Sequence, residues 1–274
     1  MKIKLYILLV IFVSISIKTI GAQTNDSIPK YETFTIESKH VGDIRTINVW
    51  SPPKYSTHTD SLPVLYMLDG GIEEDFPHIA NTLAELIVAK KIPPILLVGI
   101  QNTERRRDLT GFTVVEKDKI VAPKFGGSTT FRAFISEELF AEVNSRYRTN
   151  KQKGIIGESF AGLFVVETLL LQPNLFDFYI AFDPSLWWND KYLLKTANKL
   201  LETFPNTPKT FWFAGSGAKD IYKSTGKLAS ILQTKNIQNL HWKFSPERKE
   251  KHHTIFRATK EKALIWTLND KVKP

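Results

Sequence analysis

The chain of 274 residues contains no cysteine. It can therefore form no disulfide, thiolate nucleophile, cysteine-ligated metal site or lipid-anchoring cysteine. Without disulfides its stability must come from a hydrophobic core, and roughly 250 residues are enough to form one. The net charge is +9, but no basic stripe with interleaved aromatic residues is present, so nucleic acid is not an expected partner.

Long hydrophobic runs are also absent, with one exception near the N-terminus. Residues 5–17 are almost wholly apolar, Lys2 and Lys4 precede them, and small residues follow them. This pattern predicts that residues 1–22 are a signal peptide and that 23–274 form a single domain. An uncleaved anchor is the alternative, but the run is short for a membrane span. We expect an exported protein, periplasmic or secreted, with no stable membrane insertion after cleavage.

The remaining sequence changes from alternating to continuous hydrophobic patterns. Residues 31–38 and 43–50 alternate polar and apolar side chains around Gly42, which predicts an antiparallel hairpin. Short apolar runs typical of strands buried on both faces then alternate with helical patterns. The predicted strands are 64–68, 95–100, 154–157, 178–182, 210–215 and 240–244. The expected fold is α/β, with a mostly parallel central sheet and helices on both faces.

Ser159 lies within the stretch Gly-Glu-Ser-Phe-Ala-Gly, between a predicted strand and a predicted helix. A serine on such a sharp turn can act as a nucleophile, because its hydroxyl points away from the edge of the sheet. The pattern resembles Gly-x-Ser-x-Gly, although Ala161 stands at the last glycine position. The alternative is that Ser159 only caps the following helix.

A serine nucleophile needs a base, and three histidines follow Ser159 in the chain. His241 falls at the start of the last strand, which is the wrong end. His252 and His253 fall in the loop after that strand, where a base is expected. The histidine pair could instead bind a metal, but no further ligands accompany it at a suitable spacing, so no metal or other cofactor is expected.

The base in turn needs an acid, and Asp220 follows the penultimate predicted strand. Asp220 could also cap the helix that begins near Tyr222. Glu247 and Glu250 are the other candidates, but they stand close to His252 in sequence.

Two backbone N–H groups could bind an oxyanion, one from Phe160 and one from the Gly70-Gly71 pair. A tight turn explains the two glycines almost as well. Trp187 and Trp188 follow another predicted strand. They could line a substrate pocket, or pack in the core and cover a loop.

Nearly the whole mature chain resembles the "Putative esterase" family of α/β-hydrolases, which includes esterase D, enterochelin and other siderophore esterases, feruloyl esterases and mycolyltransferases. The resemblance rests on INVWSPPKY, PVLYMLDGG, RRRDLT, FRAFISEEL, GESFAGLF, PNLFDFYIAFDPSLWW and EKHHTI. It implies Ser159 as the nucleophile, His252 as the base, an acid near Asp220, and the N–H groups of Gly71 and Phe160 around the oxyanion. It also implies that Arg105 and Arg107 face an anionic substrate such as a ferric chelate.

Three positions depart from the family pattern. They are Ala161, Gly111 in place of the usual proline, and Asp183 where a serine is common. None removes an expected catalytic group. We expect a serine carboxylesterase that acts on a small-molecule or polysaccharide-linked ester, such as a siderophore lactone, a feruloyl ester or an acetyl ester. An acyltransferase with the same residues and a non-catalytic binding protein of this fold are the alternatives, and the oligomeric state is left open.

Overall fold

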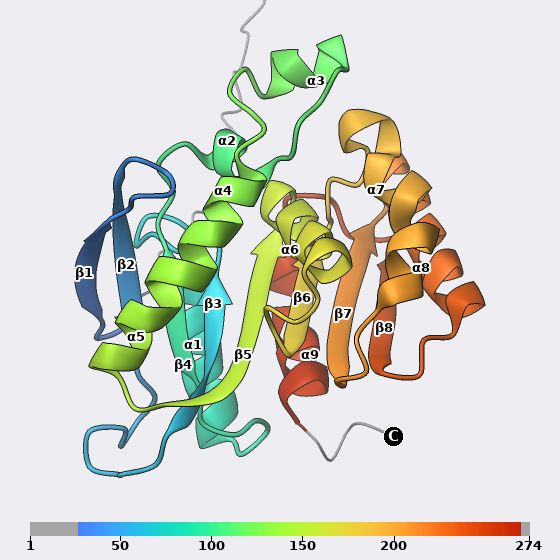
Figure 1. Ribbon diagram of the computed structural model, residues 1–274. Coiled ribbons are helices and arrows are strands. Elements are labelled where there is room, and N and C mark those ends of the chain that lie inside the picture. The colour runs from blue at the N-terminus through green and yellow to red at the C-terminus, as the bar shows by residue number, and fades with distance from the viewer. Residues whose placement is uncertain (1–26, 270–274) are drawn as a thin grey trace, which may run out of the picture.

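The computed structural model describes residues 27–269, so the predicted signal peptide lies outside the described residues (Figure 1). Within this range eight strands form one sheet in the order β1-β2-β4-β3-β5-β6-β7-β8. The strands are β1 (Glu32–Glu37), β2 (Ile44–Trp50), β3 (Leu62–Met67), β4 (Leu96–Ile100), β5 (Thr149–Glu158), β6 (Phe178–Phe182), β7 (Lys209–Ser216) and β8 (Leu240–Glu247).

The strand directions confirm the predicted sheet. β1 pairs antiparallel with β2, and β2 pairs antiparallel with β4. All other neighbouring strands are parallel. The edge strand β1 alternates exposed and half-buried residues, whereas β6 is buried at every position. This difference explains the two hydrophobic patterns in the sequence, because a strand covered on both faces needs apolar side chains on both sides.

Helices cover both faces of the sheet, as predicted. Figure 1 shows α1 and α9 on one face and α4 to α8 on the other. The helices are α1 (Phe76–Val88), α2 (Arg105–Leu109), α3 (Glu116–Val121), α4 (Ser128–Ala133), α5 (Phe140–Arg146), α6 (Phe160–Leu171), α7 (Trp188–Leu200), α8 (Lys219–Lys235) and α9 (Ile255–Leu268). A π-helical turn, Phe134–Leu139, joins α4 to α5, and a 3₁₀ turn, Leu201–Thr203, follows α7.

The core consists of two layers of buried side chains, one on each face. Phe134, Phe164 and Leu228 belong to the layer under α4 to α8. Phe76 and Leu264 belong to the layer under α1 and α9. Helix α6 is apolar all round because it is covered by its neighbours as well as by the sheet. The ring of Phe164, for example, lies 5.4 Å from that of Phe131 in α4.

The register of the three central parallel strands determines which loop residues meet. Glu158 of β5 pairs with Phe182 of β6, and Phe182 pairs with Ala214 of β7. The strands therefore end at nearly the same level. Because parallel strands place their carboxyl ends at one edge, the residues that follow them lie side by side there.

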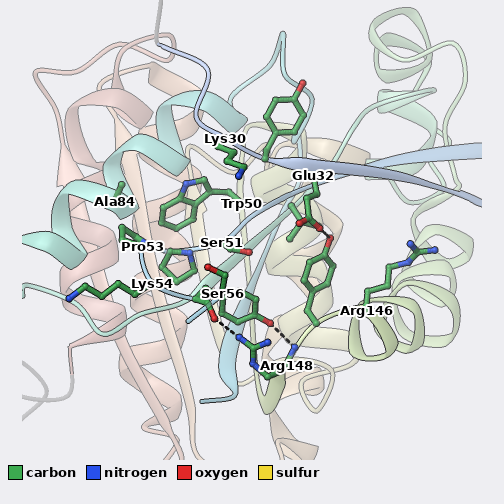
Figure 2. A pocket seen from close by; sticks show the side chains of 15 residues that line it. Lys30, Glu32, Trp50, Ser51, Pro53, Lys54, Ser56, Ala84, Arg146 and Arg148 are labelled. Carbon is green, nitrogen blue, oxygen red and sulfur yellow. Dashed lines mark hydrogen bonds between the residues drawn. The ribbon is translucent and has the colours of Figure 1, made fainter. Parts of the chain in front are cut away.

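A cavity of about 590 Å³ lies at the opposite end of the sheet, near the end of β2 and the start of β5. Figure 2 shows Trp50, Lys54 and Arg148 around it, with hydrogen bonds that tie Arg148 to Tyr55 in the loop after β2. Neither Ser159 nor His252 lines this cavity.

No helix within residues 27–269 combines the length and hydrophobicity that crossing a bilayer requires. Over the same range, no cluster of three or more His, Asp or Glu side chains has an arrangement suited to a metal ion.

Candidate active site

Ser159 lies between the end of β5 and the start of α6, in the turn that joins them. Its φ of 61° is in the left-handed region, which is uncommon for a residue with a side chain. A Cβ on Gly157 would lie 2.6 Å from the Cβ of Ala161, and one on Gly162 would lie 2.7 Å from the carbonyl oxygen of Phe182. The turn leaves no room for side chains at these glycines, and the predicted sharp strand-to-helix turn is confirmed.

The hydroxyl group of Ser159 does not cap α6, because its side chain makes no hydrogen bond to the start of the helix. The helix-cap interpretation is therefore wrong. The Oγ atom of Ser159 instead lies 3.1 Å from Nε2 of His252 and 3.5 Å from Oγ of Ser185. A hydroxyl within hydrogen-bonding distance of an imidazole is the arrangement that activates a serine nucleophile.

His252 lies in the short turn between β8 and α9. The Thr254 hydroxyl donates a hydrogen bond to Oε2 of Glu250 at 2.7 Å, and the N–H of Lys251 donates to Oγ1 of Thr254 at 3.0 Å. These bonds hold the turn in one shape around His252, which is a physical reason why Glu250 and Thr254 flank it in the stretch EKHHTI. The neighbouring His253 is exposed, and no hydrogen bond joins it to Ser159 in the part of the chain described.

Asp183 is the carboxylate that contacts His252. Its Oδ2 atom lies 2.9 Å from Nδ1 of His252, and the N–H of Ser216 donates a hydrogen bond to Oδ1 at 2.5 Å. The Asp183 side chain is fully buried, whereas that of His252 is 46% exposed. A buried carboxylate at Nδ1 favours the tautomer with the proton on Nδ1, which leaves Nε2 free to accept the proton of Ser159.

This position corrects the prediction that Asp220 is the partner of His252. Asp220 lies in the first turn of α8, is exposed, and lines a small cavity with Lys117 and Trp187. Among the described residues no hydrogen bond joins Asp220 or Glu250 to His252. The physical reason is the register described above, which brings the residue after β6, rather than the first turn of α8, beside the base.

The two predicted oxyanion donors differ in their surroundings. Phe160 is the first residue of α6, where a backbone N–H has no acceptor in a preceding helical turn. The N–H of Gly71 is already used, because it donates a hydrogen bond to Oε2 of Glu74 at 2.7 Å. The N–H of Phe160 is thus at the start of a helix next to Ser159, whereas that of Gly71 is bound to Glu74.

This geometry can be set beside known proteins. The family model described as "Putative esterase" matches residues 38–263 of the chain. The chain belongs to this family.

This esterase is 27% identical to the ferri-bacillibactin esterase BesA of Bacillus subtilis, over 92% of this chain and 94% of BesA. It is 26% identical to the apo-salmochelin esterase of Escherichia coli, over 82% of this chain and 76% of that protein. An IroE-like serine hydrolase from Shewanella oneidensis has a similar structure, with a TM-score of 0.80 and 25% identity over 86% of this chain and 79% of that one. The chain is a carboxylic ester hydrolase with an α/β-hydrolase fold.

The two arginines that the resemblance assigned to substrate binding are engaged within the protein. Arg105 forms a bidentate ion pair with Asp69, at 2.6 Å and 2.7 Å. Its guanidinium also lies 3.4 Å from the carbonyl oxygen of Glu158. Arg107 pairs with Asp108 at 2.7 Å and with Asp43 at 2.9 Å. In this structure both side chains hold the loop after β4 in place, and Arg105 does so directly beneath the nucleophile turn.

The two tryptophans have different surroundings. Trp188 is buried, donates a hydrogen bond to the carbonyl of Gly111 at 3.0 Å, and packs at 5.6 Å from the ring of Phe160. Trp187 is half-buried, lies 5.8 Å from the same ring, and lines a cavity of about 240 Å³. Trp187 is therefore the tryptophan that lines open space, in the cavity that Asp220 also lines, whereas Trp188 packs in the core.

Glu158 directly precedes Ser159, and sequence reasoning did not single it out. Burial, and after it the negative charges of Asp75, Asp183 and Asp69, raise the pKa of this carboxyl to about 8, even though Arg105 acts to lower it. Its Oε1 atom has no hydrogen-bond partner among the described residues. The side chain therefore carries a proton at neutral pH, which avoids one more negative charge beside the site.

Proposed function

We propose that this esterase is an exported serine hydrolase that cleaves siderophore esters through a triad of Ser159, His252 and Asp183. The observation that supports the triad most directly is the continuous series of contacts from carboxylate to imidazole to hydroxyl. The Asp183–His252 distance is 2.9 Å, and the His252–Ser159 distance is 3.1 Å. These are the distances that proton transfer from the serine requires.

The proposed reaction has two stages. In the first, Oγ of Ser159 attacks the ester carbonyl while Nε2 of His252 takes the hydroxyl proton and then gives it to the leaving alcohol. The N–H of Phe160 stabilises the oxyanion, together with the N–H of Gly71 once that group is free. In the second stage His252 removes a proton from water, the hydroxide attacks the acyl-enzyme, and Ser159 regains its proton.

The relatives support a siderophore ester as the substrate. Two of them are named as esterases of ferri-bacillibactin and of apo-salmochelin, and both align with most of this chain. The half-exposed imidazole of His252 also supports a bulky substrate, because the reacting groups can be approached without a deep tunnel. Export is supported by the charged and apolar pattern of residues 1–22, which lie outside the described residues.

The experiment is a panel of esters assayed with purified protein and with the Ser159→Ala variant. We expect a catecholate trilactone to be hydrolysed with a higher kcat/KM than feruloyl, acetyl or long-acyl esters. Ser159→Ala should lower kcat at least about 10⁴-fold on every ester and leave the melting temperature unchanged, because only the nucleophile is removed.

His253 provides a matched control for the base. His252→Ala should lose activity as Ser159→Ala does, whereas His253→Ala should keep most of it. Full activity of Ser159→Ala, or loss of activity in His253→Ala alone, would contradict the proposed triad. Transfer of the acyl group to an added alcohol in preference to water would show an acyltransferase instead of a hydrolase.

A further inference from the structure

A short segment after α2 carries a concentration of exposed apolar side chains. It runs over residues 111–124, includes α3, and is called the 111–124 segment below. Nine large apolar side chains are exposed in the described part of the chain, and four of them lie here. They are Phe112, Val114, Ile120 and Val121, with exposed fractions of 68%, 69%, 80% and 39%. Exposed apolar residues are normally scattered singly, so a cluster of them indicates a surface that meets a partner.

The 111–124 segment is anchored by buried polar contacts, so its apolar exposure does not come from a loosely attached loop. Asp118 is fully buried, and its Oδ2 accepts hydrogen bonds from the N–H of Asn189 at 2.7 Å and from Oγ1 of Thr113 at 3.1 Å. The carbonyl of Gly111 accepts one from the indole of Trp188 at 3.0 Å. Polar groups of the segment therefore face the protein and apolar groups face outward, which reverses the usual orientation of a surface helix.

The shape of this surface favours a lipid partner. Figure 1 shows α3 projecting beyond the rest of the molecule, at the edge of the sheet where the parallel strands end. A folded protein would need a matching hollow to cover such a projection. The interface of a bilayer needs none, because it accepts apolar side chains to a depth of roughly 5–10 Å wherever they enter.

The charges around the apolar side chains point to anionic lipids. Three acidic residues beside the segment are already paired with lysines: Glu104 with Lys124, Glu116 with Lys119, and Asp190 with Lys195. Lys117 and Lys191 line one cavity with Val121, are exposed, and form no ion pair within residues 27–269. Arg106 is also exposed and donates to the carbonyl of Val121. Against these three cations stands the carboxylate of Asp220 in the same cavity, so the local charge is positive.

We propose that the 111–124 segment docks reversibly on membrane surfaces that contain anionic lipids. Phe112 and Ile120 enter the interface between headgroups and acyl chains, while Lys117 and Lys191 lie against the headgroup phosphates. This orientation turns the edge of the sheet that carries Ser159 toward the bilayer. The binding is peripheral, since only a few side chains enter the lipid, and it involves no chemical step. It does not depend on the ester hydrolysis proposed above.

The first test uses the lack of cysteine, because a single introduced thiol can carry the environment-sensitive dye NBD at one position. Ile120→Cys places the dye in the 111–124 segment. Val88→Cys is the matched control, because Val88 is an equally exposed apolar residue at the end of α1. With vesicles of phosphatidylglycerol and phosphatidylethanolamine, we expect NBD emission at position 120 to move to shorter wavelength and rise in intensity. Emission at position 88 should stay as it is without vesicles.

The second test measures binding of the unlabelled protein by vesicle sedimentation. Phe112→Ser combined with Ile120→Ser should weaken binding at least about tenfold, because two apolar side chains no longer enter the lipid. Lys117→Gln should weaken binding to anionic vesicles by about fivefold, the contribution of one lysine near a charged membrane, and leave binding to phosphatidylcholine vesicles unchanged. Val88→Ser should bind as the wild type does.

Several results would overturn the proposal. One is an NBD emission at position 120 that does not respond to anionic vesicles, and another is equal vesicle binding by the wild type and the Phe112→Ser/Ile120→Ser variant. An emission shift that needs no lipid and grows with protein concentration would assign this surface to a second copy of the chain. Loss of kcat/KM on a soluble p-nitrophenyl ester in that variant, with vesicle binding unchanged, would make the segment a substrate contact instead.

Discussion

At the scale of single residues, the acid of the proposed triad shows how strongly function depends on position. Asp183 and Asp220 are both aspartates that follow strands of the sheet, but the sequence reasoning pointed to Asp220 and treated Asp183 only as a departure from the family pattern. Only Asp183 is fully buried and contacts His252, whereas Asp220 is exposed in the first turn of a helix. A buried carboxylate orients the imidazole, while an exposed one is screened by water and gives little orientation.

The contrast gives a paired prediction. Asp183→Asn should lower kcat by about 10⁴-fold, because an amide at this position favours the wrong tautomer of His252. Asp220→Asn should leave kcat within about twofold of wild type, since surface changes away from the site have small effects. Hydrolysis of a p-nitrophenyl ester and melting temperatures of both variants provide the measurement. The opposite pattern would move the acid from Asp183 to Asp220.

At the scale of elements, two glycines differ in whether their surroundings leave room for a side chain, one in helix α8 and one in strand β5. Gly226 lies inside α8, and a Cβ built there has no atom within 4 Å. Gly154 lies in β5, where a Cβ would approach the ring of Phe178 to 1.8 Å. Gly226 therefore lowers the stability of its helix although there is room for a side chain, whereas Gly154 is needed because Phe178 fills the space beside it.

We therefore expect Gly226→Ala to raise the free energy of unfolding by roughly 0.5–1 kcal/mol, the difference between glycine and alanine in a helix. Gly154→Ala should lower it by about 1–3 kcal/mol through overpacking. Urea unfolding followed by circular dichroism measures both effects. A destabilised Gly226→Ala variant would show that this glycine has a contact that the described residues do not explain.

One turn at the start of α7 could not be recognised from the sequence pattern. Residues 189–191 have φ values of 48°, 48° and 62°, so the chain makes a left-handed turn just after Trp188 without any glycine. Asp118 stabilises this turn, because its Oδ2 accepts a hydrogen bond from the N–H of Asn189 at 2.7 Å. The two partners are far apart in sequence, so the turn could not be predicted from local residues.

At the scale of the whole molecule, the buried carboxyl group of Glu158 makes the free energy of unfolding depend on pH. The pKa of Glu158 is raised to about 8, while the same group in an unfolded chain titrates near 4.5. Between these values the folded protein holds a proton that the unfolded chain has released. The contribution of Glu158 to the free energy of unfolding is therefore fully present below about pH 4.5 and is lost as the pH rises through about 8.

Glu158→Gln should remove this dependence, because the amide does not titrate. We expect the free energy of unfolding of the wild type to fall between about pH 5 and about pH 7.5, by at most about 1.4 kcal/mol per pH unit, and to fall less in the variant. Urea unfolding at the two pH values measures the slopes. Glu73→Gln, an exposed carboxylate in a nearby loop, should retain the wild-type slope, and an equal slope in Glu158→Gln would contradict the raised pKa.

The sequence by itself determined the architecture and pointed to two members of the proposed triad. The spacing of apolar residues indicated the hairpin, the parallel strands and most of the helices, because a strand or helix buried on one face differs in this spacing from a strand buried on both faces. The nucleophile turn was also readable, since a crowded turn admits only small residues around Ser159. His252 was expected from its place after the last strand and from the family resemblance.

Tertiary structure alone decided which side chains meet around those two residues. The register of β5, β6 and β7 brings Asp183 to His252, and the pairing of loops neutralises Arg105 and Arg107 and places Glu74 on the N–H of Gly71. These choices depend on distances between residues that are remote in the chain. Hydrophobic patterning records whether a side chain is buried, but it does not record which charged partner lies beside it.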